Sequence, residues 1–289
     1  AGGGLNVVLK AILDPGDEVI VLSPFFVEYP HYLTTFGAKL VLVDTDARFR
    51  PDAGKIAAAL SDRTRAVIVN SPNNPTGVVY DAADYDGLAA VLRAESKRQG
   101  RPVYLLSDEP YRAISYDGVD VPWPVRHYAE TIHVTSFSKD LALPGERIGY
   151  IAVNPDAEGT DELHRALTYG MRAMGFVNAP ALQQRLIEEL VGVRLDVSGY
   201  ARTRRRLLDA LAASGYELVR PDGAFYMFPQ TPNGMDDLAF VEACIQERFL
   251  VVPGSAFGCP QHFRMSYAVR EHDVDLAVDA LARVKARVG

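Results

Sequence analysis

Short apolar runs alternate with longer amphipathic segments over the first two thirds of the chain. Six runs rich in β-branched residues predict buried strands, at 18–22, 39–43, 65–70, 103–107, 132–137 and 148–153. Between two of these runs, apolar residues recur at the spacing of one helix face, at Tyr85, Leu88, Ala89 and Leu92. This alternation predicts an α/β fold, in which helices flank a mainly parallel sheet.

The pattern changes after about residue 190. A helix is predicted over 195–213, and it is followed by shorter elements: strands at 216–219, 224–228, 249–252 and 263–267, and helices at 237–248 and at the C-terminus. We therefore predict a large domain over residues 1–190 and a smaller α+β domain over 191–289. Because the chain starts without methionine, on "AGGGLNVVLK", we expect an N-terminal part of the large domain to be missing.

Composition and charge disfavour a nucleic-acid-binding protein, a membrane protein and a metal-binding protein. The 289 residues carry 30 Lys and Arg against 37 Asp and Glu, a net charge of −7, which disfavours nucleic acid or an anionic membrane as partner. No apolar run reaches the roughly 20 residues of a membrane span, and no signal peptide is visible. Cys244 and Cys259 lack the spacing of metal ligands, so we predict no metal, reduced thiols and a cytoplasmic location.

Polar residues follow several of the predicted strands. "NSPNNPTG" after the third strand offers Asn74, "SDEPY" after the fourth offers Asp108 and Tyr111, and "SFSK" after the fifth offers Lys139 beside two serines. Since ligands of such sheets bind beyond the carboxyl ends of the strands, these groups are expected at one site. "SPFFVEY" after the first strand adds an aromatic wall from Phe25 or Phe26, and "AGGG" before a helix is typical of an anion-binding loop.

Together these groups meet the needs of a flat, phosphorylated heteroaromatic aldehyde with a ring nitrogen that accepts a proton. A lysine amine forms a Schiff base with such an aldehyde. A carboxylate such as Asp108 keeps a pyridine nitrogen protonated, which makes the ring an electron sink. The phosphate requires hydroxyls, backbone N–H groups and a guanidinium, which Ser136, Ser138, Arg147 and residues 1–3 supply.

The same motifs resemble the class I/II aminotransferases of fold type I, the pyridoxal-phosphate enzymes typified by aspartate aminotransferase. The resemblance extends over nearly the whole chain and includes "LDPGDEVIVLSPFFVEY", "VNSPNNPTG", "SDEPY", "SFSKDLALPGERIG", "PDGAFYMF", "VVPGSAFG" and "FRMSYA", in the order and approximate spacing of that family.

The resemblance implies pyridoxal 5'-phosphate as cofactor and a role for each matching residue. Lys139 matches the Schiff-base lysine, Asp108 the partner of the ring nitrogen, and Arg264 the arginine that binds the substrate α-carboxylate. The other implied contacts are Asn74 and Tyr111 at the ring oxygen, Phe26 stacked on the ring, and Ser136, Ser138, Arg147, Ala1 and Gly2 at the phosphate. Lys139, Asp108 and Tyr111 are the implied catalytic residues, and Asn74 is also implied beside the substrate.

The resemblance further implies ping-pong transfer of an amino group from an L-amino acid to a 2-oxo acid, in amino acid metabolism. It also implies a homodimer with its sites at the interface, which Asn178 approaches. The substrate type stays open between aspartate, alanine and aromatic amino acids. Arg172 is a candidate for an acidic side chain, but a surface arginine is the stronger interpretation, and Phe26 stands where aspartate-specific members often have tryptophan.

Two alternatives and one departure remain at this stage. A lyase of the same fold, similar to aminocyclopropane-carboxylate synthase, shares the cofactor motifs, and some transcription regulators carry an aminotransferase-like effector domain. A nicotinamide enzyme is disfavoured because no G-x-G-x-x-G follows a strand. The resemblance implies an N-terminal segment that closes over the substrate and would precede Ala1, so we predict weak cofactor binding and poor activity for a chain that starts at Ala1.

Overall fold

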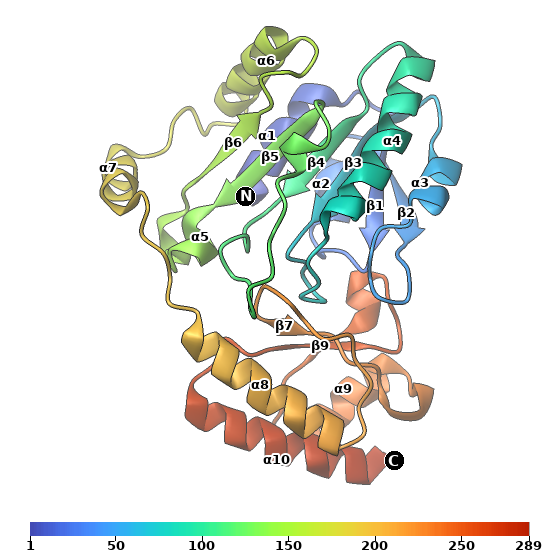
Figure 1. Cartoon of the computed structure of the whole chain (residues 1–289), viewed down its shortest axis with the longest axis vertical. Coiled ribbons are helices and arrows are strands. Elements are labelled where there is room, and N and C mark those ends of the chain that lie inside the picture. The colour runs from blue at the N-terminus through green and yellow to red at the C-terminus, as the bar shows by residue number, and fades with distance from the viewer. Residues whose placement is uncertain (289) are drawn as a thin grey trace.

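The computed structural model describes residues 1–288, and its largest element is a six-stranded sheet (Figure 1). The strands lie in the order β2-β1-β3-β4-β5-β6; the first five are parallel, and β6 runs antiparallel to β5. Their bounds are β1 Glu18–Ser23, β2 Lys39–Asp44, β3 Thr64–Asn70, β4 Tyr104–Asp108, β5 Thr131–Ser136 and β6 Gly149–Val153. The predicted α/β fold with a mainly parallel sheet is confirmed.

Helices cover both faces of this sheet because its strands are apolar on both sides. One buried cluster joins alternate strand residues, among them Leu106 and Val134, to α1 (Gly2–Ile12), α2 (Tyr29–Thr35) and α6 (Thr160–Ala173). The intervening residues, such as Leu105, form a second cluster on the other face with α3 (Ala53–Ala59) and α4 (Ala82–Gln99). Successive side chains of a strand point to opposite faces of the sheet. The cluster to which a strand residue belongs therefore shows on which face its neighbours along the strand lie.

A smaller part of the chain follows α7 (Ala181–Leu190) and has a core of its own. Its elements are α8 Ser198–Ala213, β7 Tyr226–Met227, α9 Asp237–Gln246, β8 Val252–Pro253, β9 Phe263–Ser266 and α10 Glu271–Val288. The three short strands form an antiparallel sheet in the order β7-β9-β8, and α8, α9 and α10 pack a third apolar cluster against it. None of the helices described is long and apolar enough to cross a membrane.

The strand predicted at 216–219 is wrong, and the one at 224–228 is reduced to β7. Tyr216 and Leu218 are apolar because they pack into the third cluster, where the Tyr216 hydroxyl donates to the carbonyl of Leu281 at 3.3 Å. Over 216–219 the structure has no ladder of strand pairing. Apolar alternation reports burial of side chains, and here burial occurs without a partner strand.

The two parts meet at the carboxyl ends of the parallel strands. Figure 1 shows β1 and β2 pointing toward the smaller sheet. The carbonyl of Gly77, in the loop after β3, accepts hydrogen bonds from the backbone N–H groups of Asp222 at 2.9 Å and Gly223 at 2.8 Å. The N–H of Phe25, just after β1, likewise donates to the carbonyl of Phe257 at 3.1 Å. The polar strand ends therefore face residues of the smaller part.

Candidate functional site

Asp108 ends β4 with its side chain buried on the face of the sheet that α1 and α2 cover. The Tyr29 hydroxyl donates to its Oδ2 at 2.7 Å, whereas Oδ1 is buried and has no hydrogen-bond partner among residues 1–288. Burial raises the pKa of this carboxyl to about 6, although the hydrogen bond from Tyr29 opposes the rise. A buried acceptor atom with no partner is rare, which indicates a site for a donor from a ligand.

Lys139 lies in the short helix α5 (Phe137–Asp140), directly after β5. Its ammonium group is half-buried and lies 5.6 Å from the ring centre of Phe225 in the smaller part. Burial, and secondly the charge of Arg147, lower the pKa of Lys139 below its ordinary value. A larger fraction of this amine is therefore uncharged near neutral pH, which is the form that attacks a carbonyl or accepts a proton.

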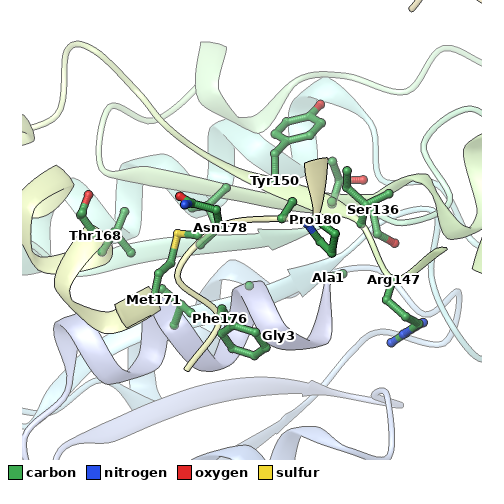
Figure 2. Close-up of a pocket in the computed structure, with 18 of the residues that line it drawn as sticks. Ala1, Gly3, Ser136, Arg147, Tyr150, Thr168, Met171, Phe176, Asn178 and Pro180 are labelled. Carbon is green, nitrogen blue, oxygen red and sulfur yellow. The ribbon is translucent and has the colours of Figure 1, made fainter. Parts of the chain in front are cut away.

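The polar residues implied at a phosphate gather at one end of a pocket of about 670 Å³ (Figure 2). Ser136 at the end of β5 and Ser138 in α5 line it, together with Arg147 and Ala1 at the start of α1. Arg147 follows the turn η2 (Pro144–Glu146) in a left-handed conformation, and its Nη1 donates to the carbonyl of Pro144 at 2.9 Å. Hydroxyls, a guanidinium and a helix N-terminus together suit an anion.

Gly2 does not line this pocket. A Cβ built on Gly2 would lie 2.8 Å from the Tyr32 hydroxyl, so this residue faces α2. Apolar side chains form the other end of the pocket, where Figure 2 shows Phe176 beside Gly3 and Met171. Asn178 lines the pocket too, whereas Arg172 is exposed on α6.

Asn74 and Arg264 meet although 190 positions separate them in the sequence. Arg264 Nη1 donates to Asn74 Oδ1 at 2.9 Å, and the guanidinium lies 4.6 Å from the ring centre of Tyr226 and 4.9 Å from that of Phe257. Asn74 is held in turn by Asn70, whose Oδ1 accepts from its backbone N–H at 2.7 Å. Burial lowers the pKa of the Arg264 guanidinium.

Tyr111 and Phe26 border the same region from two sides. The hydroxyls of Tyr111 and Tyr226 lie 3.1 Å apart, and burial raises the pKa of the Tyr111 phenol well above its ordinary value. Phe26 is partly buried and meets Tyr29 edge to face with ring centres 5.5 Å apart, and Tyr29 is the residue that holds Asp108.

Reasoning from the sequence missed Tyr29 and the aromatic residues of the smaller part. Tyr29 ends the motif "SPFFVEY", three residues after Phe26, and its place in that motif was the available signal. Phe225 and Tyr226 stand in "PDGAFYMF" and Phe257 in "VVPGSAFG", two motifs that matched the family without an assigned role. Their contacts with Lys139, Tyr111 and Arg264 depend on how the two sheets meet, which local patterns do not determine.

The donor set fits pyridoxal 5'-phosphate. Among residues 1–288 no group of three or more His, Cys, Asp or Glu side chains is placed to hold a metal ion. The buried and unpartnered Asp108 Oδ1 suits a protonated ring nitrogen, the Lys139 amine suits an aldehyde, and the polar end of the pocket suits a phosphate.

Comparison with known proteins agrees with this fit. The sequence profile of the family "Aminotransferase class I and II" matches residues 1–281. The aspartate/prephenate aminotransferase of Thermus thermophilus is 36% identical over 97% of this chain and 72% of that protein. The aspartate aminotransferase of Bacillus subtilis is 29% identical over 97% of this chain and 72% of that protein.

Solved structures give the same result. An aminotransferase from Eubacterium rectale matches with a TM-score of 0.95 and 38% identity, over 99% of this chain and 72% of that one. The Thermus thermophilus aspartate aminotransferase with maleate matches with a TM-score of 0.81 and 33% identity, over 98% of this chain and 74% of that one. Aminotransferase names among these relatives do not favour the lyase or the regulator alternative. The chain belongs to the class I and II aminotransferases, pyridoxal-phosphate-dependent enzymes that transfer an amino group between amino acids and 2-oxo acids.

Proposed function

We propose that the region between the two sheets binds pyridoxal phosphate and catalyses transamination, with Lys139 as the residue that attaches the cofactor. The observation that carries the proposal is Asp108, whose Oδ1 is buried without a hydrogen-bond partner among the described residues. Asp108 would face the ring nitrogen, Asn74 and Tyr111 the ring oxygen, and Phe26 the ring surface. The phosphate would lie among Ser136, Ser138, Arg147 and Ala1, with Gly2 next to them at the start of α1.

When bound, the cofactor supplies an electron sink for the carbanion formed at the substrate Cα. The chain's own residues bind, orient and move protons. Lys139, whose pKa is lowered, would take the proton from the substrate Cα as a base and give it up again as an acid. Asp108 would hold the ring nitrogen protonated, and Tyr29 fixes the direction of this carboxylate by its hydrogen bond to Oδ2.

Arg264 is the proposed binding group for the α-carboxylate of the substrate. Its guanidinium is partly buried between two aromatic rings, and Asn74 accepts a bond from one of its nitrogens. A guanidinium oriented in this way can offer its remaining N–H groups to both oxygens of a carboxylate. Because every amino acid and 2-oxo acid carries this carboxylate, Arg264 serves both half-reactions.

Aspartate is the proposed amino donor, because several relatives are named aspartate or aspartate/prephenate aminotransferases. Alanine and aromatic amino acids are the alternatives to compare in the same assay. Phe26 stacking on the ring, in place of the tryptophan common in aspartate-specific members, is compatible with a broader choice.

We also propose that the enzyme is a cytoplasmic homodimer with residues 1–190 and 191–289 as its two domains. Tyr169 on α6, Phe176 after it and Leu182 on α7 are exposed, and Phe176 also lines the pocket whose polar end suits the phosphate. Large apolar side chains gathered on a surface are typical of an interface. Cys244 and Cys259 are free thiols, as is usual in a reducing compartment.

The half-reaction tests the proposal. The cofactor-loaded protein is mixed with a single amino acid, and absorbance reports conversion of the aldehyde cofactor to its aminated form. Aspartate is expected to convert it, and oxaloacetate, its 2-oxo acid, is expected to convert it back. Release of a cleavage product without an aminated cofactor would support a lyase, and no response to any amino acid would contradict an enzymatic role.

A further inference from the structure

Glu109 follows Asp108 directly, and its carboxylate is buried in a cluster that the proposed reaction does not use. Ser107 Oγ donates to Glu109 Oε1 at 2.6 Å, His133 Nδ1 lies 3.0 Å from the same oxygen, and Arg112 Nη1 donates to Oε2 at 2.5 Å. The side chains of Glu109 and His133 are 1% and 3% exposed. A buried carboxylate keeps its charge only where partners compensate the lost hydration, and these three contacts supply that compensation.

The cluster lies on the opposite face of the sheet from the proposed cofactor site. Leu105 of β4 packs in the cluster of α3 and α4, and strand alternation places Ser107 and Glu109 on that same face. In β5, Val134 packs against α1, which places His133 on the face of Glu109. Asp108 therefore points toward the ligand side, while its neighbour Glu109 points away and is fixed.

Fixing Glu109 fixes the backbone that carries two proposed catalytic groups. The Glu109 N–H donates to the carbonyl of Val134 at 2.9 Å, and Thr135 Oγ1 donates to the carbonyl of Glu109 at 2.9 Å. Arg112 extends the network, since it also donates to the carbonyls of residues 121 and 122, and its guanidinium lies 3.3 Å from the ring centre of Trp123. Asp108 and Tyr111 lie within residues 107–112, the segment that these contacts hold in place.

We propose that Glu109 and Arg112, together with His133, are positioning residues that hold Asp108 and Tyr111 at the angle the cofactor ring requires. The inference rests on the proposed function. On its own face of the sheet, Asp108 makes one side-chain hydrogen bond within the described residues, the one from Tyr29. Its direction therefore depends on the backbone, and the cluster behind the sheet holds that backbone in place. Burial is the main cause of the raised pKa of Asp108, and the Glu109 charge adds a smaller rise that His133 opposes.

The chain offers a matched control. Glu95 in α4 is also buried, pairs with Arg98 at 2.6 Å and accepts from Gln99 Nε2 at 2.7 Å. Glu95→Gln and Glu109→Gln each remove one carboxylate charge that an arginine pairs, but only Glu109 adjoins Asp108. Urea unfolding of each cofactor-free variant measures how far the change affects folding alone.

The test compares cofactor binding in the wild type and the variants. Glu109→Gln is expected to bind pyridoxal phosphate roughly tenfold more weakly, the scale on which residues behind a ligand shell act. Its visible circular dichroism band, which reports the tilt of the bound ring, is expected to change. Glu95→Gln is expected to match the wild type in both measurements.

Two variants of Arg112 test the same proposal if Glu109→Gln does not fold. Arg112, whose side chain is 15% exposed, breaks the same cluster from its outer edge. Arg112→Gln is expected to weaken cofactor binding in the same way, and Arg112→Lys, which keeps the charge beside Glu109, is expected to restore part of it. Wild-type dichroism and affinity in Glu109→Gln and Arg112→Gln would overturn this inference alone, whereas a wild-type chain that binds no cofactor would overturn the proposed function with it.

Discussion

Replacing Asp108 by asparagine should stabilise the cofactor-free protein while it impairs the enzyme. The folded state raises the pKa of this carboxyl from 3.8 to about 6, so it holds its proton longer than the unfolded chain does. Asp108 therefore favours folding at low pH, and this contribution is lost as the pH rises from about 4 to about 6. Asparagine has nearly the same shape but carries no charge, so the variant does not lose stability through ionisation at this position.

The magnitude follows from the two pKa values. Ionising Asp108 inside the fold lowers the free energy of unfolding by about 3 kcal/mol at pH 8, but by only about 1.5 kcal/mol at pH 5. The stability advantage of Asp108→Asn over the wild type should therefore grow by about 1.5 kcal/mol between these two pH values. Titrating groups that lie far from Asp108 are shared by the two proteins and cancel in the comparison, whereas the Ala1 amine, whose pKa the Asp108 charge raises, does not.

Urea unfolding of the cofactor-free proteins at pH 5 and pH 8 measures this difference. Asp237 supplies a control, because it is equally buried but accepts a 2.7 Å bond from the N–H of Ser255, and such bonds lower its pKa despite burial. Asp237→Asn should differ from the wild type by the same amount at pH 5 and pH 8, because a carboxyl with a lowered pKa is already ionised in the folded and the unfolded state at pH 5. If the stability difference between Asp108→Asn and the wild type stays constant or shrinks from pH 5 to pH 8, Asp108 does not have a raised pKa in the folded protein.

Three further substitutions test other parts of the account. Tyr29→Phe removes the hydrogen bond that lowers the pKa of Asp108, so the acidic limb of the kcat/KM profile should move upward by about one pH unit, and an unmoved limb would contradict this role. Arg264→Ala should raise KM for every amino acid tested by roughly a hundredfold, because they share the α-carboxylate; an effect confined to one substrate would point to side-chain recognition instead. Gly77→Ala would place a Cβ 2.4 Å from a proline side chain of the smaller part, whereas Gly100, also left-handed, has open space around it. In chemical denaturation Gly77→Ala should lose about 2 kcal/mol more than Gly100→Ala, and equal losses would show that the contact between the two parts tolerates the methyl group.

The sequence was sufficient for the large sheet and not for the small one. The inner parallel strands β1, β3 and β4 are buried along nearly their whole length and therefore appear as apolar runs, such as 65–70 for β3. The small strands are two to four residues long, and their apolar residues merge with those of loops that pack on the same core. Local patterns cannot separate these cases, which is why 216–219 was mistaken for a strand.

For the site, the sequence identified groups at strand ends but not their partners. The order of parallel strands brings Asn74, Asp108 and Lys139 to one edge, which general rules anticipate. The contact of Asn74 with Arg264 depends on how two separately folded sheets meet. The cluster around Glu109 depends on the register of β4 against β5, which pairs Ser107 with His133 and which no single segment encodes.

Lys139 is the residue proposed to form the covalent bond to the cofactor, and this bond can be tested directly. The protein is loaded with pyridoxal phosphate, reduced with borohydride to fix the bond, digested, and analysed by peptide mass spectrometry. The reduced cofactor is expected on the peptide that contains Lys139 and is expected to be missing from Lys139→Ala. Stoichiometric modification of any other lysine, or cofactor bound at full occupancy with Lys139 unmodified, would contradict it.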